Sequence, residues 1–307
     1  QNLSDVAETL LIPLYVRAIE SQRPDALLKD EKAVALITQT DRDFSWIKRL
    51  KMDEGDKTAL VLRNREFDRH VRDFLARHPQ AVVVHIGCGL DSRFERVDNG
   101  LVEWYDLDLP EVIELRRKFI GGEGARYHLL ACSVFDDTWL STVSAHRQRP
   151  FLFLAEGVLM YFKEAQVKSL VLTLRAHFPG AELVCDAFSP FLVWANNRRM
   201  ARGKFGVRYH WGLRRGKDLE RWGEGIHLLD EWFLFDRPEP RLAHLRWIRF
   251  IPLLAKVIGV FHYRLGEAPQ GEGSRMSYTG RDSVHGIPSL LTFVSPMMHY
   301  PPLRAKA

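Results

Sequence analysis

The stretch Ala81-Val-Val-Val-His-Ile-Gly-Cys-Gly-Leu-Asp-Ser92 carries the strongest fold signal in the chain. Its first six residues form a short apolar run, which is typical of a strand buried on both faces of a parallel sheet. Gly87 and Gly89 follow directly, and glycines after a strand permit a tight turn and a close approach of the backbone to a ligand. A plain strand–helix turn is the alternative, because Ser92 stands where a dinucleotide fingerprint has its third glycine.

On both sides of this turn, strand-like and helix-like segments alternate. Residues 3–77 read as helical, a clear amphipathic helix is expected at 163–178, and another helix is expected near 241–258. Besides 81–86, strands are predicted at 101–107, 126–131, 151–155, 181–187, 225–235 and 260–264. The alternation predicts βαβ units and an open, mostly parallel α/β sheet.

Two acidic residues lie where a ribose-binding carboxylate is expected. Asp106 follows Gly87 by 19 residues, and Asp108 follows Gly89 by the same interval, both at the end of the second predicted strand. A carboxylate at this place can accept hydrogen bonds from two ribose hydroxyls. The alternative is an acid placed at a helix N-terminus, where the helix dipole favours it. Together, the glycines and the acids predict a nucleoside ligand.

Two further charged residues stand in apolar surroundings. Arg63 falls on the apolar face of the helix predicted over 58–78, where a guanidinium needs an anionic partner. That partner is either a ligand or an internal carboxylate, unless the side chain reaches past the apolar face to solvent. Glu156 follows the very apolar strand 151–155, and open α/β sheets bind ligands at such strand ends. A helix cap is the alternative for Glu156.

Composition excludes several classes of protein. The 307 residues carry a net charge of +5, but residues 198–221 alone carry +7, so the positive charge is local and we expect no nucleic-acid partner. No run of 18 apolar residues occurs, so we expect no membrane partner. No secretory signal is evident and the three cysteines are widely spaced, which predicts a cytoplasmic protein with reduced thiols. Motifs for metal sites, serine hydrolases and P-loops are missing, so we expect no metal.

The basic segment lies within an aromatic-rich stretch, residues 188–235, that interrupts the alternation. Aromatic rings beside guanidinium groups suit a flat, anionic organic molecule. The alternative is an amphipathic helix that packs its aromatic side chains on the sheet. His210 and His227 are candidate bases for a reaction that removes a proton from a hydroxyl group. The candidate substrate-binding residues in this stretch are Trp194, Tyr209, His210 and Trp211.

Five motifs in this order resemble the leucine carboxyl methyltransferase family and, within it, the bacterial polyketide-type O-methyltransferases. The motifs are Leu14–Glu20, Arg63–Asp68, Gly87–Arg93, Tyr105–Pro110 and Ala155–Tyr161, and the likeness extends from about residue 10 to residue 266. The resemblance implies a Rossmann-like class I methyltransferase fold with seven strands and helices on both faces of the sheet. It also implies S-adenosylmethionine as the cofactor.

The resemblance further implies a role for individual residues. Arg63, helped by Arg17, would hold the methionine carboxylate, and Asp108 with Asp106 would take the ribose hydroxyls. Ser133 stands where the family usually has an adenine-binding aspartate. The implied catalytic residues are Glu156, near the sulfonium and amino group, and Tyr161, facing the acceptor. The implied cofactor-binding residues are Arg63, Arg17, Gly87, Cys88, Gly89, Asp106, Asp108, Ser133, Val134 and Glu156.

These observations predict one methyltransferase domain over residues 1–266, followed by an irregular tail at 267–307. Within the domain we expect a helical cap (3–78), a cofactor-binding core (79–187), a substrate-binding insertion (188–235) and a last helix and strand (236–266). The predicted reaction is O-methylation of a carboxylate or hydroxyl on a small, acidic, aromatic or polyketide-like metabolite, by a monomer or weak homodimer. A nicotinamide-dependent oxidoreductase and a non-catalytic S-adenosylmethionine or anion binder are the alternatives.

Overall fold

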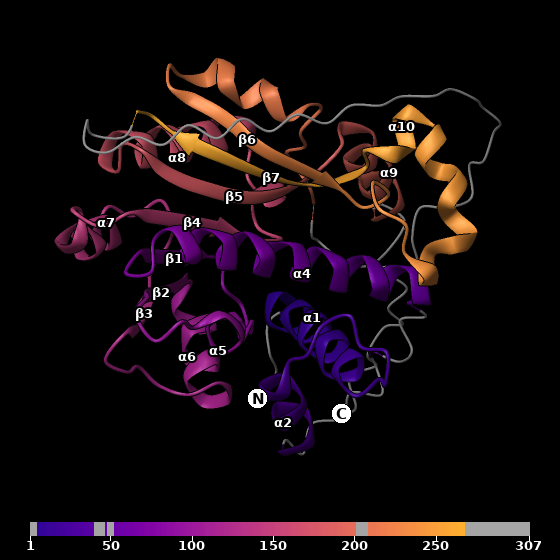
Figure 1. The fold of residues 1–307 in the computed structure, drawn as a ribbon, viewed down its shortest axis with the longest axis horizontal. Coiled ribbons are helices and arrows are strands. Elements are labelled where there is room, and N and C mark those ends of the chain that lie inside the picture. The colour runs from indigo at the N-terminus through magenta and orange to yellow at the C-terminus, as the bar shows by residue number, and fades with distance from the viewer. Residues whose placement is uncertain (1–4, 40–46, 48–51, 201–207, 268–307) are drawn as a thin grey trace, which may run out of the picture.

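A computed structural model of the chain describes residues 5–39, 47, 52–200 and 208–267. At its centre lies one sheet of seven strands with helices on both faces (Figure 1). The strand order is β3-β2-β1-β4-β5-β7-β6, which confirms the predicted Rossmann-like α/β class. The strands are β1 (Val82–Ile86), β2 (Glu103–Asp108), β3 (Tyr127–Ala131), β4 (Phe151–Ala155), β5 (Ala181–Phe188), β6 (Ile226–Phe233) and β7 (Ile258–Leu265).

The direction and order of the strands determine where a ligand can bind. β1 to β5 pair in parallel, whereas β7 runs antiparallel to both β5 and β6. β1 pairs with β2 on one side and with β4 on the other, so the chain switches to the other half of the sheet between β3 and β4. Open α/β sheets bind their ligands at the carboxyl ends of the strands beside such a switch point.

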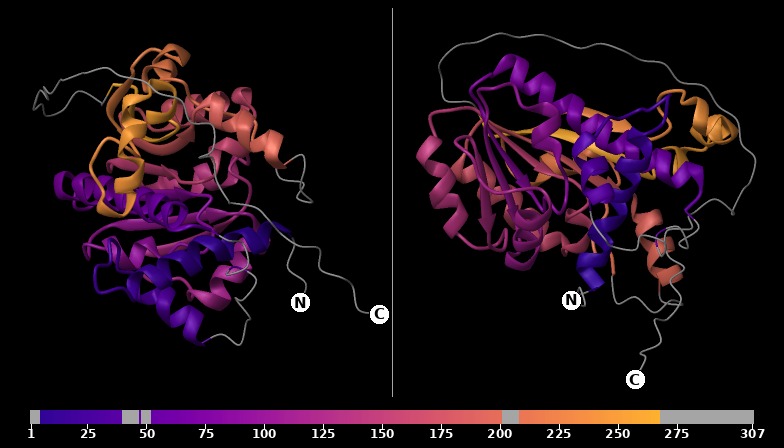
Figure 2. Two further views of the ribbon diagram at one scale, coloured as in Figure 1. Left: turned by 90° about the vertical axis from the view of Figure 1, so that its right-hand side faces the viewer. Right: turned by 90° about the horizontal axis from the view of Figure 1, so that it is seen from below.

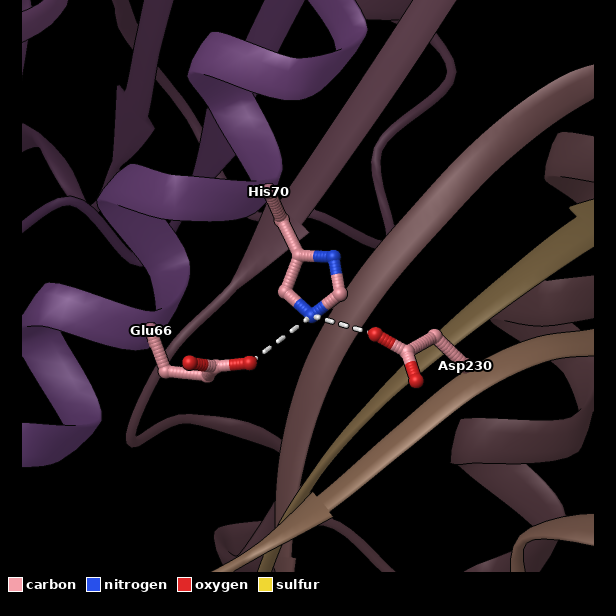
Figure 3. Close-up of side chains that lie close together, drawn as sticks. All are labelled: Glu66, His70 and Asp230. Carbon is pink, nitrogen blue, oxygen red and sulfur yellow. Dashed lines mark ion pairs between the residues drawn. The ribbon is translucent and has the colours of Figure 1, made fainter. Parts of the chain in front are cut away.

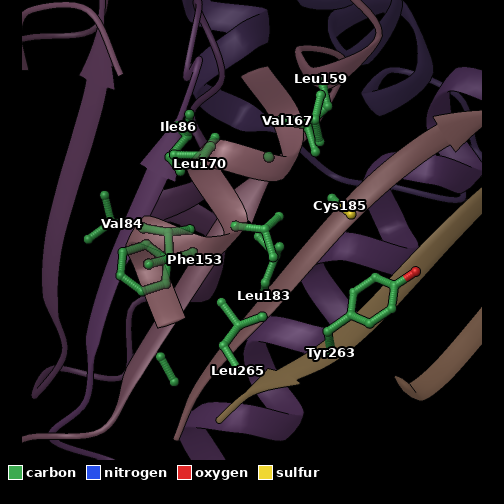
Figure 4. Close-up of a cluster of buried hydrophobic side chains, with 14 of the residues drawn as sticks. Val84, Ile86, Phe153, Leu159, Val167, Leu170, Leu183, Cys185, Tyr263 and Leu265 are labelled. Atoms are coloured by element: carbon green, nitrogen blue, oxygen red, sulfur yellow. The ribbon is translucent and has the colours of Figure 1, made fainter. Parts of the chain in front are cut away.

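Helices cover both faces because successive side chains of the central strands point to opposite faces and are apolar on both. Val84 and Ile86 of β1 pack in one cluster with Val167 and Leu170 of α8 (Glu164–His177), the helix predicted at 163–178 (Figure 4). Val83 lies in the opposite cluster, with side chains of α4 (Glu54–Arg77). The other α-helices are α1 (Asp5–Ser21), α2 (Glu31–Gln39), α5 (Arg93–Val97), α6 (Pro110–Phe119), α7 (Thr138–Val143), α9 (Pro190–Met200) and α10 (Pro252–Ala255).

α1 and α2 lie toward the carboxyl ends of the parallel strands, and the long α4 runs from there across one face of the sheet. Leu14 of α1, Leu36 of α2 and Leu60 of α4 share a buried cluster with Leu90, which directly follows the glycine turn. α4 begins after Asp53, whose carboxylate accepts a hydrogen bond from the backbone N–H of Asp56 at 2.7 Å. These three helices agree with the helical pattern predicted for residues 3–77, but residues 22–30 between α1 and α2 form turns and irregular chain, which the prediction missed.

The helix expected near 241–258 is present as two shorter helices. The structure has a 3-10 helix, η4 (Pro240–Phe250), then the short α10, and β7 already begins at Ile258. Pro252 comes two residues after η4 ends and cannot donate the hydrogen bond that would continue a helix. Leu242, Leu245 and Ile248 are buried at intervals of three residues, the repeat of a 3-10 helix.

The stretch predicted as an insertion, 188–235, contains α9, the 3-10 helix η3 (Gly216–Trp222) and β6, which is the edge strand of the sheet. The other 3-10 helices are η1 (Ser144–His146) and η2 (Leu159–Tyr161). The tail predicted from residue 267 lies, except for its first residue, outside the described part of the chain. No helix in the described part combines the length and the hydropathy needed to cross a membrane.

Candidate functional site

The predicted cofactor residues converge at the carboxyl edge of the sheet. β1 leads into Gly87, β2 ends at Asp108, and β4 leads into Glu156, so segments far apart in sequence meet there. In Figures 1 and 2, α1 and α9 lie toward this end of the sheet. The topology alone therefore brings the glycine, aspartate and glutamate motifs together.

The glycine turn has the geometry that its sequence predicts. Gly87 and Gly89 have φ angles of +66° and +51°, which side-chain-bearing residues rarely adopt. A Cβ atom on Gly87 would lie 2.8 Å from Cγ2 of Val158, so the turn also has no room for a side chain there. Cys88 between them is buried in the core, and burial raises the pKa of its thiol. Cys88 therefore offers a ligand its backbone only.

The two aspartates after the glycines have different surroundings. Asp108 accepts the backbone N–H groups of Gly89 and Leu109, both at 2.8 Å, and burial raises its pKa. It is half-buried, and a carboxylate that has accepted two hydrogen bonds can still accept others. Asp108 is therefore positioned to bind a ribose at the end of β2.

Asp106 does not share this role, which corrects the prediction. Its carboxylate has no exposed surface and forms an ion pair with Arg116. It also accepts hydrogen bonds from Trp104 Nε1 at 2.8 Å and from the Tyr127 hydroxyl at 2.6 Å. Residues two positions apart in a strand point to the same face of the sheet. Sequence spacing alone therefore could not tell which of Asp106 and Asp108 faces the ligand.

Arg63 lies between two carboxylates, and we call Arg63, Glu156 and Asp186 the Arg63 triad. Arg63 Nε donates to Glu156 at 3.0 Å, and Arg63 Nη1 donates to Asp186 at 2.9 Å. The second oxygen of Asp186 accepts the backbone N–H of Gly157 at 2.7 Å. Burial alone would lower the pKa of Arg63, but Asp186 and Glu156 raise it, so this guanidinium remains charged. The internal salt bridge left open by the sequence is present, and it lies at the predicted ligand site.

Sequence reasoning missed Asp186, Asn64 and Arg93. Glu156 accepts Asn64 Nδ2 and Arg93 Nη2, each at 2.6 Å, in addition to Arg63. Asp186 lies near the end of a predicted strand. The same position identified Glu156, so this signal could also have identified Asp186. Arg93 comes from α5, and nothing in its local sequence indicates a partner 63 residues away.

Arg17 contacts residues beside the glycine turn and forms no hydrogen bond or ion pair with the Arg63 triad, all of whose residues the structure describes. Its Nε donates to Asp30 and its Nη2 to the backbone carbonyl of Leu90, both at 2.8 Å. The side chain is buried. These contacts tie α1 to the chain directly after the glycine turn, so Arg17 stays a prediction as a cofactor contact and has a visible role in holding that turn.

Ser133 and Val134 lie just beyond the end of β3, where the adenine was predicted. The Ser133 hydroxyl accepts the N–H of Phe135 at 3.2 Å, and its own N–H donates to the Asp136 carboxylate at 3.1 Å. The Val134 carbonyl accepts Trp139 Nε1 at 3.1 Å. The serine therefore forms a turn. Asp136 places a carboxylate in this loop, which is what a replacement for the adenine-binding aspartate implied by the resemblance would have to do.

Two tyrosines stand beside the Arg63 triad on the acceptor side. Tyr161 ends η2 and is 40% exposed, whereas Tyr209 is nearly buried, and their ring centroids lie 5.4 Å apart. Tyr161 and Tyr209 interact with each other, and each interacts electrostatically with the Arg63 guanidinium. Burial raises the pKa of Tyr209, which keeps this phenol neutral. The neighbouring His210 is exposed and is anchored through its backbone N–H to the Met160 carbonyl at 2.8 Å.

The two tryptophans predicted to bind substrate differ. Trp194 on α9 is 56% exposed and lies near Phe191, with a centroid separation of 6.1 Å. The guanidinium carbon of Arg198 stands 5.6 Å from its ring centroid. Trp211 is only 3% exposed and packs in the main core cluster, near Trp222. The prediction for Trp211 is therefore wrong, because the ring is a core side chain.

A cluster of metal-binding residue types lies outside this edge, where α4 meets β6. Glu66, His70 and Asp230 point toward one another (Figure 3). Arg69 Nη2 lies among them, at 2.6 Å from Glu66, 2.8 Å from Asp230 and 3.1 Å from His70 Nε2. Burial lowers the pKa of His70 to about 2, so its ring is neutral. An arginine nitrogen therefore stands where a metal ion would bind.

The sequence and fold were compared with known proteins. A family model described as leucine carboxyl methyltransferase matches residues 11–175. The chain is 36% identical over 238 residues to the tetracenomycin polyketide synthesis O-methyltransferase TcmP of Streptomyces glaucescens, covering 77% of this chain and 86% of that protein. It is 29% identical over 266 residues to the S-adenosyl-L-methionine-dependent methyltransferase dpfgK of Gibberella zeae, covering 80% and 88%.

Two solved structures share the fold. A Thermobifida fusca protein aligns with a TM-score of 0.55 at 16% identity, over 82% of this chain and 94% of that chain. A duf574 family protein from Streptomyces avermitilis aligns with a TM-score of 0.54 at 12% identity, over 83% and 96%. At these identities the likeness supports the fold alone.

The residues at the carboxyl edge fit S-adenosylmethionine. Gly157 has a φ of +69°, and a Cβ there would lie 3.6 Å from Arg63 Nη2, so the missing side chain leaves that nitrogen accessible. Oδ1 of Asn64, beside Glu156, is buried without a hydrogen-bond partner and can accept from a ligand ammonium. Asp108, half-buried at the end of β2, fits the predicted role of ribose ligand. Together with the family match, these features show that the chain belongs to the leucine carboxyl methyltransferase family and is an S-adenosylmethionine-dependent methyltransferase.

Proposed function

We propose that the enzyme transfers its methyl group to an oxygen of a small, flat, anionic metabolite, and preferably to a carboxylate. The observation that carries this proposal is the exposed Trp194 on α9, with Arg198 beside its ring. An exposed indole next to a guanidinium provides a stacking surface and a positive charge for a planar anion. The segment around Arg198, residues 198–221, carries a net charge of +7 in the sequence.

When bound, S-adenosylmethionine supplies an electrophilic methyl group on its sulfonium. The protein has to align the acceptor oxygen with that methyl group and to exclude water, and alignment alone can supply much of the rate. Trp194 and Arg198 would hold the acceptor from α9, and the Tyr161 hydroxyl would orient it from η2. Arg63, Asp108 and the glycine turn would hold the cofactor. These roles need no covalent step on the enzyme.

A carboxylate acceptor is favoured over a hydroxyl because it needs no general base, and one of the two candidate bases, His227, lies far from the site. His227 lies near the beginning of β6, which runs in the same direction as β5. This side chain is therefore at the amino-terminal ends of these strands, away from the carboxyl ends where the cofactor residues lie. His210 is exposed to solvent. A carboxylate is already ionised at neutral pH and needs no base, whereas a phenol must lose its proton.

One relative and the family model bear on the oxygen acceptor. The name of TcmP, at 36% identity, states O-methylation within polyketide synthesis, and the family model is named for carboxyl methylation. These names support an oxygen acceptor of the acidic, aromatic or polyketide type for this chain.

The test is an acceptor screen. The enzyme is incubated with S-adenosylmethionine and a panel of planar aromatic and polyketide-like compounds in matched pairs, carboxylic acid against amide and phenol. Mass spectrometry detects the added methyl group, and mild alkali separates methyl esters, which hydrolyse, from methyl ethers, which persist. We expect alkali-labile products from the acids only, reduced in Trp194→Ala. Methylation confined to nitrogen or carbon atoms would contradict the proposal, and alkali-stable products from phenols would contradict its preference for carboxylates.

A further inference from the structure

The Arg63 triad contains two carboxylates and one guanidinium, and the two carboxylates are not equally compensated. Glu156 also receives Arg93 and Asn64, each at 2.6 Å. Asp186 receives only Arg63 Nη1 at 2.9 Å and the backbone N–H of Gly157 at 2.7 Å. Among the described residues, no second cation forms an ion pair with Asp186.

Asp186 is also the most deeply buried member of the triad, with no exposed surface. A buried carboxylate is costly unless it is well paired, and its only cation is shared with Glu156. Burial accordingly raises the pKa of Asp186, although Arg63 opposes this. Asp186 is therefore the carboxylate at this edge that gains most from an additional positive charge.

The cofactor and its product differ in the charge that they bring. The α-carboxylate and the ammonium are common to S-adenosylmethionine and S-adenosylhomocysteine and cancel in both. Only the sulfonium of S-adenosylmethionine adds a net positive charge. When the acceptor oxygen forms its bond to the methyl carbon, the C–S electron pair stays on sulfur and this charge disappears.

We propose that Asp186 is the residue that makes the site prefer the charged cofactor over its neutral product. Arg93 compensates Glu156 but not Asp186, whose only cation, Arg63, is shared with Glu156, so the charge of Asp186 is incompletely compensated. The sulfonium offsets this remaining charge, and nothing in S-adenosylhomocysteine does. Methyl transfer thus removes the interaction that helps to hold the cofactor, which favours release of the product. This inference concerns the cofactor and is independent of the acceptor proposed above.

The test compares three ligands by isothermal titration calorimetry: S-adenosylmethionine, S-adenosylhomocysteine, and sinefungin, a stable analogue with an ammonium in place of the sulfonium. In the wild type, both cationic ligands should bind about tenfold or more tightly than S-adenosylhomocysteine, the equivalent of one pKa unit of charge interaction. Asp186→Asn keeps an oxygen for the Gly157 N–H and should bring this ratio close to one, mainly by weakening the cationic ligands.

Glu182→Gln is the matched control. Glu182 lies on the same strand, is also buried and is also paired with an arginine, Arg77, but at the opposite edge of the sheet. It should leave the ratio unchanged. A wild type that binds S-adenosylhomocysteine as tightly as both cationic ligands would overturn the proposal, and this result requires no variant. An equal weakening of all three ligands by Asp186→Asn would also overturn it, since Asp186 would then serve the shared ammonium or only position Arg63.

Discussion

Replacing Asp106 and Asp108 separately by asparagine should give opposite phenotypes, although the residues are two positions apart. Asp106 is wholly buried and paired with Arg116, whose guanidinium is also buried. Asp106→Asn leaves that guanidinium without its anion, and breaking a buried ion pair costs about 3–5 kcal/mol of folding stability. Because Asp106 has no surface at the site, the affinity of the folded variant for S-adenosylhomocysteine should change little.

Asp108→Asn should act on binding. Both Asp108 oxygens accept a backbone N–H at 2.8 Å, from Gly89 and Leu109. An amide has a single oxygen, so its NH2 group has to face one of these donors. The variant also offers the ribose hydroxyls a weaker acceptor. A lost hydrogen bond to a charged group is worth about 1.5–3 kcal/mol, and 2 kcal/mol is about a thirtyfold loss of affinity.

Urea unfolding followed by tryptophan fluorescence gives the stability of both variants, and calorimetric titration with S-adenosylhomocysteine gives their affinity. The reasoning is refuted if Asp106→Asn keeps wild-type stability but loses affinity for the ligand. It is equally refuted if Asp108→Asn binds like the wild type. Either result would restore Asp106 as the ribose ligand that the sequence spacing also allows.

Three further predictions follow from single sites. Gly87→Ala should destabilise by about 1–3 kcal/mol more than Gly100→Ala in urea unfolding, because both have positive φ but only Gly87 would place its Cβ against a neighbour. Trp194→Ala should raise the acceptor KM about tenfold, the loss of one aromatic contact, with an unchanged Kd for S-adenosylmethionine; an unchanged KM would remove α9 from the acceptor site. Burial lowers the pKa of His70 to about 2, so between pH 2 and about 6.5 this side chain binds a proton only in the unfolded chain. Below pH 6, the free energy of unfolding of the wild type should therefore fall by about 1.4 kcal/mol for each unit of decreasing pH, relative to His70→Gln. Parallel pH profiles for the two proteins would show that His70 is not held neutral.

The fold could be predicted from sequence because its signals are local. The apolar run before Gly87 is buried along its whole length as β1, and the later strands were placed by the same pattern. The local pattern was less informative at Pro240–Phe250, where one helix was predicted and the structure has a 3-10 helix followed by the short α10. Proline spacing was the missed signal, since Pro240 begins this segment and Pro252 follows it.

The site could be predicted only in part, because its electrostatics are not local. Arg63 pairs with residues 93 and 123 positions away, and no spacing rule in one sequence indicates such partners. Asp186 and Arg93 were therefore missed. Trp211 was misassigned for a related reason: aromatic content identifies a segment, but only packing determines which ring is buried in the core.

The most direct test of the account concerns Arg63. Arg63→Lys keeps a positive charge between Glu156 and Asp186. It removes the planar guanidinium, which contacts both carboxylates and also places Nη2 next to Gly157. Equilibrium binding of S-adenosylmethionine should weaken more than about tenfold, or 1.4 kcal/mol, while the variant remains folded by circular dichroism. A folded variant that binds S-adenosylmethionine with wild-type affinity would contradict the assignment of this edge of the sheet as the cofactor site.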